Sequence, residues 1–181
     1  MTVFDNAPRS RPMSLLSPLR AVIALAILAT PVVAEDLPEP TGDPLLVVSG
    51  AITNTNVGDT ASFDFEMLEN LETRTFTTKT IWTDGDQTFT GVQLSDLMEL
   101  VGAEGDVIKA TAINDYAVDI PREDWVDDGP MVAFLNNGET MPVRQKGPLW
   151  IVYPFDQNPE YQTEQIYSRA IWQLDRIIVL D

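Results

Sequence analysis

The chain has 181 residues, of which 28 are Asp or Glu and 11 are Lys or Arg, so its formal net charge at pH 7 is −17. A surface of this sign repels the phosphates of nucleic acids and the head groups of anionic lipids, and neither is an expected partner. The sequence contains no cysteine and no histidine. This composition excludes disulfides, thiolate metal sites and catalysis by a cysteine or histidine side chain.

The first 34 residues are typical of a secretory signal peptide. Three arginines precede the unbroken apolar run 21–29, and small residues up to Ala34 come directly before the acidic pair Glu35-Asp36. The apolar run is too short to span a bilayer, and no two of the arginines are adjacent, as a twin-arginine signal requires. We therefore expect export to the periplasm in an unfolded state, cleavage after Ala34, and no membrane insertion of the mature chain.

Two further features concern the beginning of the chain. Translation starts at either Met1 or Met13, because both leave a workable signal. Cleavage after Ala34 removes three arginines and one aspartate, which lowers the formal charge from −17 to −19. The acidic, proline-rich segment 35–44 predicts a disordered lead-in, and residues 45–181 have the length of one domain.

Periodicity predicts an α+β domain with a mostly antiparallel, mixed sheet and short helices. The expected strands are 45–52, 73–82, 88–92, 107–113, 117–120, 131–135, 149–153, 168–172 and 174–180. The expected helices are 63–71, started by Ser62 or Asp64, and 94–101, started by Ser95 and ended by Gly102, with a helical turn in 122–128. Turn residues at Asp84-Gly85 and at 136–138 indicate two hairpins, and the polar segment 155–167 is expected to loop out.

One stretch concentrates scarce positive charge beside backbone-breaking residues. Arg144 and Lys146 directly precede Gly147-Pro148, which cannot continue a helix and predicts an exposed bend. A loop of this kind is suited to hold an anionic group or a ring carbonyl through charge-assisted hydrogen bonds. The alternative is that both cations only offset neighbouring carboxylates on the surface.

A second candidate group combines amide, carboxylate and phenol side chains at a strand break. These side chains could form hydrogen bonds with the donor and acceptor atoms along the edge of a heterocycle; the residues are Asn114, Asp115 and Tyr116. Equally, Asn and Asp favour turns for local reasons. Arg169 adds a third cation that suits bidentate anion contacts, with an ordinary surface ion pair as the alternative.

Aromatic residues form the third candidate group. Trp82, Trp150, Tyr153 and Tyr167 could sandwich a flat ring, although aromatic residues in strands also serve as core. None of the three groups is specific by itself.

Four segments taken together carry a family resemblance: 89–97, 114–116 with 120–121, 146–154 and 167–174. In this order they resemble the sulfite-oxidase-like molybdopterin-binding domain family, in its small stand-alone periplasmic branch, and the resemblance covers roughly residues 45–181. It implies the fold of that domain, with a pocket for a pterin ring.

The chain departs from the family at the positions that carry its chemistry. The resemblance implies that a cysteine thiolate should ligate molybdenum from a loop corresponding approximately to 78–83, and this chain has none. The histidine before the family's glycine is Lys146 here, and the arginine after its proline is replaced within Leu149-Trp150. Without the thiolate, molybdenum lacks its protein ligand, so neither bound molybdenum nor catalysis is expected.

The similarity to cysteine-less relatives implies a periplasmic pterin-binding protein that senses its ligand and reports to the periplasmic domain of a membrane signalling protein. The alternatives are a molybdopterin-dependent oxidoreductase that works without the thiolate, and a structural adaptor domain with a vestigial pocket. The residues predicted to bind a pterin or molybdopterin-like ligand are Trp82, Asn114, Asp115, Tyr116, Arg144, Lys146, Trp150, Tyr153, Tyr167 and Arg169.

Overall fold

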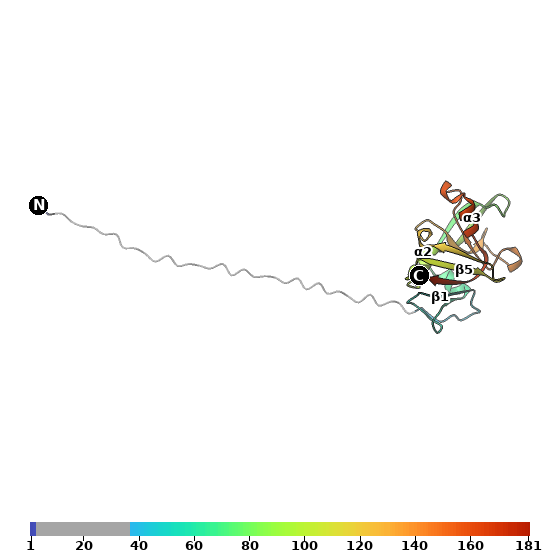
Figure 1. Cartoon of the computed structure of the whole chain (residues 1–181), viewed down its shortest axis with the longest axis horizontal. Coiled ribbons are helices and arrows are strands. Elements are labelled where there is room, and N and C mark those ends of the chain that lie inside the picture. Colours follow the sequence, from blue (N-terminus) through green and yellow to red (C-terminus); the bar gives the residue numbers. More distant parts are fainter. Residues whose placement is uncertain (3–36) are drawn as a thin grey trace. The chain divides into compact units, whose positions relative to one another are not determined.

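The computed structural model describes residues 1–2 and 37–181 (Figure 1). Residues 3–34 of the predicted signal peptide and its cleavage site lie outside the described residues. Within the described part of the chain, no helix has the length and apolar character needed to cross a membrane.

The domain is built on strands, as the periodicity predicts. The strands are β1 (Leu46–Gly50), β2 (Ala61–Phe63), β3 (Thr73–Lys79), β4 (Asp86–Gln93), β5 (Val107–Ala112), β6 (Ala117–Pro121), β7 (Met131–Asn136), β8 (Glu139–Thr140), β9 (Leu149–Val152) and β10 (Trp172–Leu180). The α-helices are α1 (Phe65–Asn70), α2 (Leu94–Leu100) and α3 (Glu164–Arg169), and short 3-10 turns are η1 (Arg122–Asp124), η2 (Val143–Gln145) and η3 (Pro159–Tyr161).

The strands form one branched, mixed sheet in the order β2-β1-β10-β9-β7-β4-β3, with β5 on β10 and β6 on β5. Every strand pair is antiparallel except β1 with β10, which confirms the predicted fold class. β10 is the strand on which this sheet branches. Along one edge it pairs first with β9 (172–174) and then with β1 (176–179), and along the other edge it pairs with β5 (174–180). Gln173 has a positive φ of 56° where the register with β9 shifts.

Local signals identified most elements correctly. The β3–β4 hairpin turns through Gly85, whose φ of 69° needs a residue tolerant of the left-handed region. Asp64 caps α1 by accepting a hydrogen bond from the Met67 amide at 2.9 Å. The cap predicted at Ser95 is wrong, because β4 runs directly into α2 at Gln93 without a side-chain cap.

The largest error lies after β9. The segment expected to loop out contains η3 and most of α3, and residues 168–169, expected in a strand, end that helix. Thr163 starts α3, since its hydroxyl accepts a hydrogen bond from the Ile166 amide at 3.3 Å. The predicted strand 168–172 therefore begins four residues before β10, which starts at Trp172.

The segment 37–44 makes specific contacts, unlike the disordered lead-in that its composition predicts. Asp64 Oδ2 accepts hydrogen bonds from the amides of Thr41 (2.9 Å) and Gly42 (2.8 Å), and the Asn56 amide group donates to the Pro38 carbonyl at 2.7 Å. Backbone hydrogen bonds from Met67 and Gly42 lower the pKa of Asp64. The carboxylate thus joins this segment to the start of α1.

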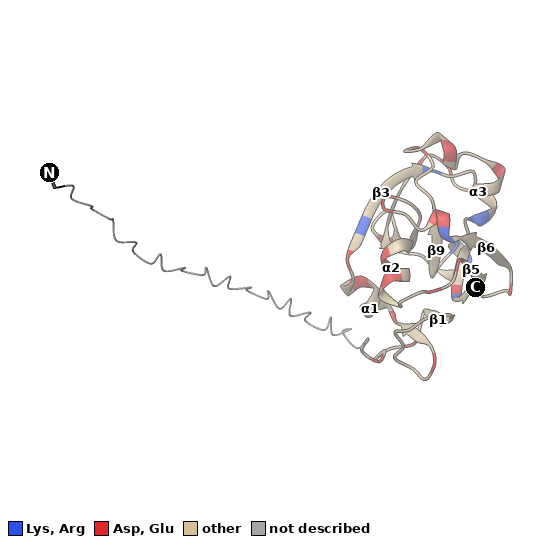
Figure 2. Cartoon of the chain, turned by 60° about the vertical axis from the view of Figure 1, so that its left-hand side comes forward, with Lys and Arg blue, Asp and Glu red and all other residues tan. Residues whose placement is uncertain are grey.

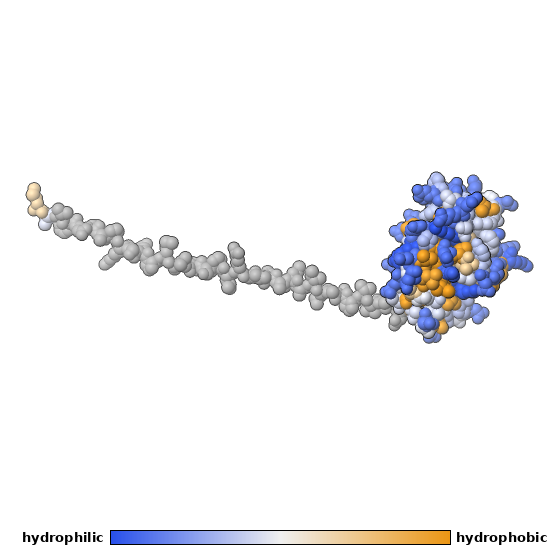
Figure 3. All heavy atoms as spheres, viewed as in Figure 1, coloured by the Kyte–Doolittle hydropathy of each residue, from blue (hydrophilic) through white to orange (hydrophobic). Residues whose placement is uncertain are grey.

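Buried side chains from nearly every strand form one core, in which the largest are Trp150, Tyr153, Phe63, Phe89 and Phe155. Charged residues lie around it, and Figure 2 shows the excess of acidic over basic positions. Figure 3 shows apolar atoms gathered on one face of the domain among hydrophilic ones.

Candidate ligand-binding site

Three tryptophans from distant parts of the chain meet at one end of β9 and β10. Trp150 and Trp172 are cross-strand neighbours in the β9–β10 pair, and Trp82 comes from the loop between β3 and β4. Their ring centroids are 6.1 Å (Trp150–Trp172), 6.0 Å (Trp82–Trp150) and 5.4 Å (Trp82–Trp172) apart, all edge-to-face. This geometry is favourable for aromatic rings. We call these three residues the tryptophan wall.

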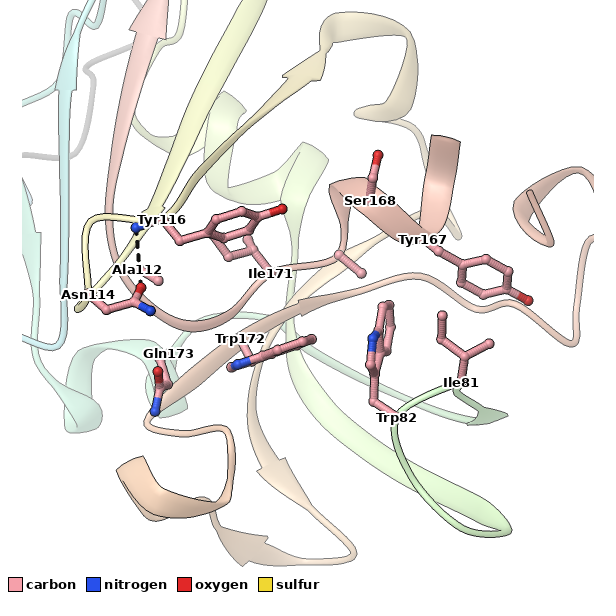
Figure 4. A pocket seen from close by; sticks show the side chains of 11 residues that line it. Ile81, Trp82, Ala112, Asn114, Tyr116, Tyr167, Ser168, Ile171, Trp172 and Gln173 are labelled. Carbon is pink, nitrogen blue, oxygen red and sulfur yellow. Dashed lines mark hydrogen bonds between the residues drawn. The ribbon is translucent and has the colours of Figure 1, made fainter. Parts of the chain in front are cut away.

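On one side of the wall lies a cavity of about 400 Å³, which we call the aromatic slot. Its lining residues are Ile81, Trp82, Ala112, Asn114, Tyr116, Tyr167, Ser168, Ala170, Ile171, Trp172 and Gln173. Figure 4 shows the Tyr116 ring across the slot from Trp172, with Trp82, Tyr167 and Ile81 at the opposite end from Asn114 and Gln173. Tyr116 is 55% exposed and so remains available for stacking.

The end of the slot formed by the Asn114 and Gln173 side chains offers a ligand one hydrogen-bond donor group and one acceptor. Asn114 Oδ1 accepts a hydrogen bond from the Tyr116 amide at 3.2 Å, which leaves the Asn114 NH₂ group as a donor. Gln173 Nε2 donates to the Val143 carbonyl at 2.7 Å, which leaves Gln173 Oε1 as an acceptor. A donor beside an acceptor is complementary to the N–H and C=O of a cyclic amide.

On the other side of the wall is a cleft of about 490 Å³, which we call the cationic cleft. Its lining residues are Trp82, Thr83, Asn136, Asn137, Glu139, Thr140, Met141, Pro142, Arg144, Gln145, Lys146 and Trp150. Lys146 Nζ lies 5.1 Å from the Trp172 ring centroid and 6.0 Å from that of Trp150. Both distances are within the range of cation–π attraction.

The Gly147-Pro148 bend differs in one respect from the sequence prediction. Gly147 is buried rather than exposed, and its bond to Pro148 is cis. A Cβ atom at this position would lie 1.7 Å from the Met141 carbonyl oxygen, so the close approach requires glycine. Lys146 adopts the left-handed region (φ 73°), and its carbonyl accepts a hydrogen bond from the Gln173 amide at 3.0 Å. The bend is therefore held against β10 and positions the two cations in the cleft.

Three of the predicted ligand contacts lie in neither cavity. The Tyr153 hydroxyl donates to Asp124 Oδ2 at 2.7 Å, and Arg169 Nη1 is 2.9 and 2.8 Å from the two Asp124 oxygens. Asp115 forms an ion pair with Arg176 on the outer surface. The structure thus divides the single predicted site. Trp82, Asn114, Tyr116 and Tyr167 belong to the slot, and Arg144, Lys146 and Trp150, again with Trp82, belong to the cleft.

Sequence reasoning did not single out Ile81, Trp172 and Gln173. Trp172 and Gln173 lie within the 167–174 segment, whose resemblance to the family was a usable signal. Ile81 follows β3 and is 63% exposed, which is unusual for an isoleucine and visible only in the structure.

The sequence pattern of the family described as "Oxidoreductase molybdopterin binding domain" matches residues 60–156. The chain therefore belongs to this family, which the resemblance of its motifs indicated. A crystal structure of the sulfane dehydrogenase SoxCD from Paracoccus pantotrophus aligns with a TM-score of 0.57 and 22% identity, over 75% of this chain and 38% of that chain. The two share a fold, and this chain spans well under half the length of that one. A comparison with curated proteins found no match.

The family implies a molybdopterin-type cofactor, and the two halves of that cofactor fit this chain differently. The slot suits the ring half, because it combines aromatic surfaces with a donor and an acceptor. The metal half lacks its donor set, since the loop corresponding approximately to 78–83 supplies no thiol and its Trp82 indole packs against Trp150 and Trp172. In the described residues no group of three or more His, Cys, Asp or Glu side chains could hold a metal ion.

Proposed function

We propose that this chain is a periplasmic pterin-binding protein that senses its ligand and signals to the periplasmic domain of a membrane protein, without molybdenum catalysis. The observation that supports this most directly is the aromatic slot. A flat ring that enters it can stack between Tyr116 and Trp172 while its amide edge meets Asn114 and Gln173.

Each contact in the slot contributes a modest free energy to binding. Stacking of a ring on an aromatic side chain contributes about 1–3 kcal/mol, and each neutral hydrogen bond contributes about 0.5–1.5 kcal/mol net. Association also has an entropic cost. Micromolar binding, which corresponds to about −8 kcal/mol, suits a protein that must release its ligand when the concentration falls.

Two further observations support sensing and export. Ile81 and Tyr116, which line the slot, are 63% and 55% exposed, so a partner that covers the opening would contact both protein and ligand. The pattern of residues 1–34 supports export to the periplasm. The missing thiolate is the reason to separate binding from molybdenum catalysis.

Calorimetric titration of the mature protein with a panel of uncharged oxidised and reduced pterins tests the binding. We expect at least one pterin to bind with micromolar affinity. Tyr116→Ala should weaken that binding about tenfold, because it removes one stacking surface worth about 1.4 kcal/mol or more. Tyr116→Phe is the matched control and should bind as the wild type does, because it keeps the ring.

The signalling part requires a second experiment. The mature protein, immobilised with and without the bound pterin, should retain a membrane protein from detergent-solubilised membranes of its own cell only in the presence of the ligand. If the membrane protein is retained equally with and without pterin, and no pterin binds to the mature protein, the result would support the structural adaptor. Stoichiometric molybdenum in protein purified from the native periplasm would support the oxidoreductase.

A further inference from the structure

β3 is an outermost strand of the sheet, and one of its two edges is open. In the described part of the chain it pairs with β4 alone, through seven consecutive residue pairs without a bulge. Three of its threonines, Thr73, Thr75 and Thr77, are exposed, and Figure 2 shows the strand along the outer side of the domain. An open edge of this length is able to pair with a further strand.

The direction of the β3 amides follows from two contacts. The Lys79 amide donates to Asp156 Oδ2 at 2.7 Å, so it points away from β4. The hydroxyl oxygens of the opposite residues Thr75 and Thr90 lie 2.9 Å apart, as expected for a cross-strand pair that exchanges no main-chain hydrogen bonds, because the side chains are closest there. Amides alternate in direction along a strand, so the three exposed threonines all direct theirs to the open edge.

The other edge strands are protected in ways that β3 is not. β6 has five residues, ends at Pro121 and packs against α3, while β2 has three residues and β8 has two. Short length, proline and a covering helix are the usual protections of a sheet edge against further pairing. β3 has seven residues and no proline. Its edge is therefore the one among these that is suited to strand addition.

Asp156 limits the register in which a second strand can pair. Its carboxylate occupies the Lys79 amide, so the free part of the edge is Thr73, Thr75 and Thr77. Two copies of β3 related by a two-fold axis at Thr75 use all of it, because Thr75 then pairs with its own counterpart and Thr73 with Thr77 of the second copy. Each such pair exchanges two main-chain hydrogen bonds. A shift by two residues in either direction leaves one of these threonines unpaired in each copy.

The side chains of β3 are also self-complementary in this register. On one face, the threonine pairs that join β3 to β4 continue across the two-fold axis, and such cross-strand pairs are favourable. On the other face, Arg74 comes opposite the half-buried Phe76 of the second copy, which suits cation–π attraction. Glu72 comes opposite Thr78, and Lys79 opposite an apolar residue, so no like charges face each other.

We infer that the open edge of β3 is a self-association surface, through which two copies of this chain join their sheets about a two-fold axis at Thr75. The inference goes beyond the proposed function, because it involves no ligand and, among the described residues, none of β3 lines the slot or the cleft. A single strand pair is smaller than the ~1,000 Å² that a stable interface usually buries, so the dimer is weak and dissociates on dilution.

Sedimentation equilibrium of the mature protein, from micromolar to millimolar concentration, tests the self-association. The average mass should rise toward that of a dimer in the wild type and stay that of a monomer in Thr75→Pro. The domain tolerates this proline, because the amide that it removes points away from β4, and an unchanged near-ultraviolet circular dichroism spectrum checks that the variant is folded. Thr75→Val keeps the amide and is the matched control, which should associate as the wild type does.

Cysteine substitutions test the register, because the chain has no cysteine of its own. Thr75→Cys should form a disulfide-linked dimer with oxidised glutathione, since the Cα atoms of a hydrogen-bonded cross-strand pair are about 5.5 Å apart, within disulfide range. Thr77→Cys, on the same strand and face, should not, because its counterpart lies four residues, about 13 Å, along the second strand. Thr73→Cys alone should not either, but a mixture of Thr73→Cys and Thr77→Cys should form a cross-linked heterodimer.

Three results would overturn the inference. The first is a wild type that stays monomeric at every concentration, and the second is a folded Thr75→Pro that associates as strongly as the wild type. The third is equal cross-linking of Thr75→Cys and Thr77→Cys, which would place the axis elsewhere. If the wild type is monomeric while Thr75→Pro no longer retains the membrane protein, the edge receives a strand of that protein instead of a second copy. Failure of every pterin to bind would contradict the proposed function alone, since no arm of this test contains a pterin.

Discussion

Arg169, at the end of α3, lies with one guanidinium nitrogen 2.9 and 2.8 Å from the two carboxylate oxygens of Asp124, which is 45 positions earlier in η1. The side chains are 12% and 8% exposed, so this is a buried ion pair. Tyr153 donates a third hydrogen bond to the same carboxylate at 2.7 Å. The pair joins α3, which carries two residues of the slot, to η1, which directly follows β6.

Replacement of Arg169 by methionine, which keeps much of its volume, should destabilise the protein by about 3–5 kcal/mol, because it leaves the buried Asp124 carboxylate without its counter-charge. Urea denaturation measures the change in the free energy of unfolding. The exposed pair of Arg74 and Glu72, at 51% and 71% exposure, supplies the control. Arg74→Met should cost less than about 1 kcal/mol. Equal effects of the two substitutions would mean that the Arg169 pair contributes no more than a surface pair.

Stability should decrease in alkaline solution through Tyr153. Burial, followed by the nearby Asp124 carboxylate, raises the pKa of Tyr153 far above its ordinary value of 10.0. A group whose pKa is raised on folding contributes stability below its unfolded pKa and loses that contribution as the pH rises. Above about pH 10 the free energy of unfolding should therefore fall by an additional ~1.4 kcal/mol per pH unit.

The substitution Tyr153→Phe isolates this effect, because it removes the titrating group while keeping the ring. The free-energy difference between wild type and Tyr153→Phe should be constant from pH 7 to about pH 9.5 and should then shrink as the pH rises. Urea denaturation at a series of pH values measures it. A difference that stays constant to pH 11 would show that the tyrosine ionises no differently in the folded and unfolded protein.

Binding of a flat ring in the slot should quench the emission of the tryptophan wall. Trp172 and Trp82 line the slot, whereas Trp125 packs beneath Arg122, at 5.4 Å, and lines neither the slot nor the cleft. Titration of Trp125→Phe should therefore show the same or a larger fractional quench than wild type, and Trp172→Phe a smaller one. Calorimetric binding with unchanged emission in the wild type would place the ligand away from the wall.

Export should produce a mature chain that begins at Glu35. Intact mass measurement on protein from the periplasmic fraction tests this, and the mature chain should carry a formal charge of −19, since three arginines and one aspartate are removed. A mature N-terminus upstream of residue 21 would contradict the prediction, because the apolar run would then remain as an anchor.

The sequence by itself determined the elements that depend on neighbouring residues. Thr and aromatic residues on either side of Gly85 specified the β3–β4 hairpin, and apolar spacing with Gly102 specified α2, because these signals act within a few positions. The motif order 89–97, 114–116, 146–154 and 167–174 also identified the family correctly. The start of α3 was not predicted, although Thr163 is an ordinary N-cap residue whose hydroxyl accepts a hydrogen bond from the Ile166 amide.

Only the tertiary structure decided which candidates share a site. Arg144, Arg169 and Asp115 are all charged and equally plausible as ligand contacts in the sequence, yet they lie in the cleft, in a buried pair and on the outer surface, respectively. Their partners are far away along the chain: Arg169 bonds to Asp124, and Asp115 pairs with Arg176. Such contacts depend on strand order and register, which the pairing of β10 with β1, β5 and β9 establishes. The same pairing brings Trp172 beside Trp150, where Trp82 completes the wall that separates the slot from the cleft.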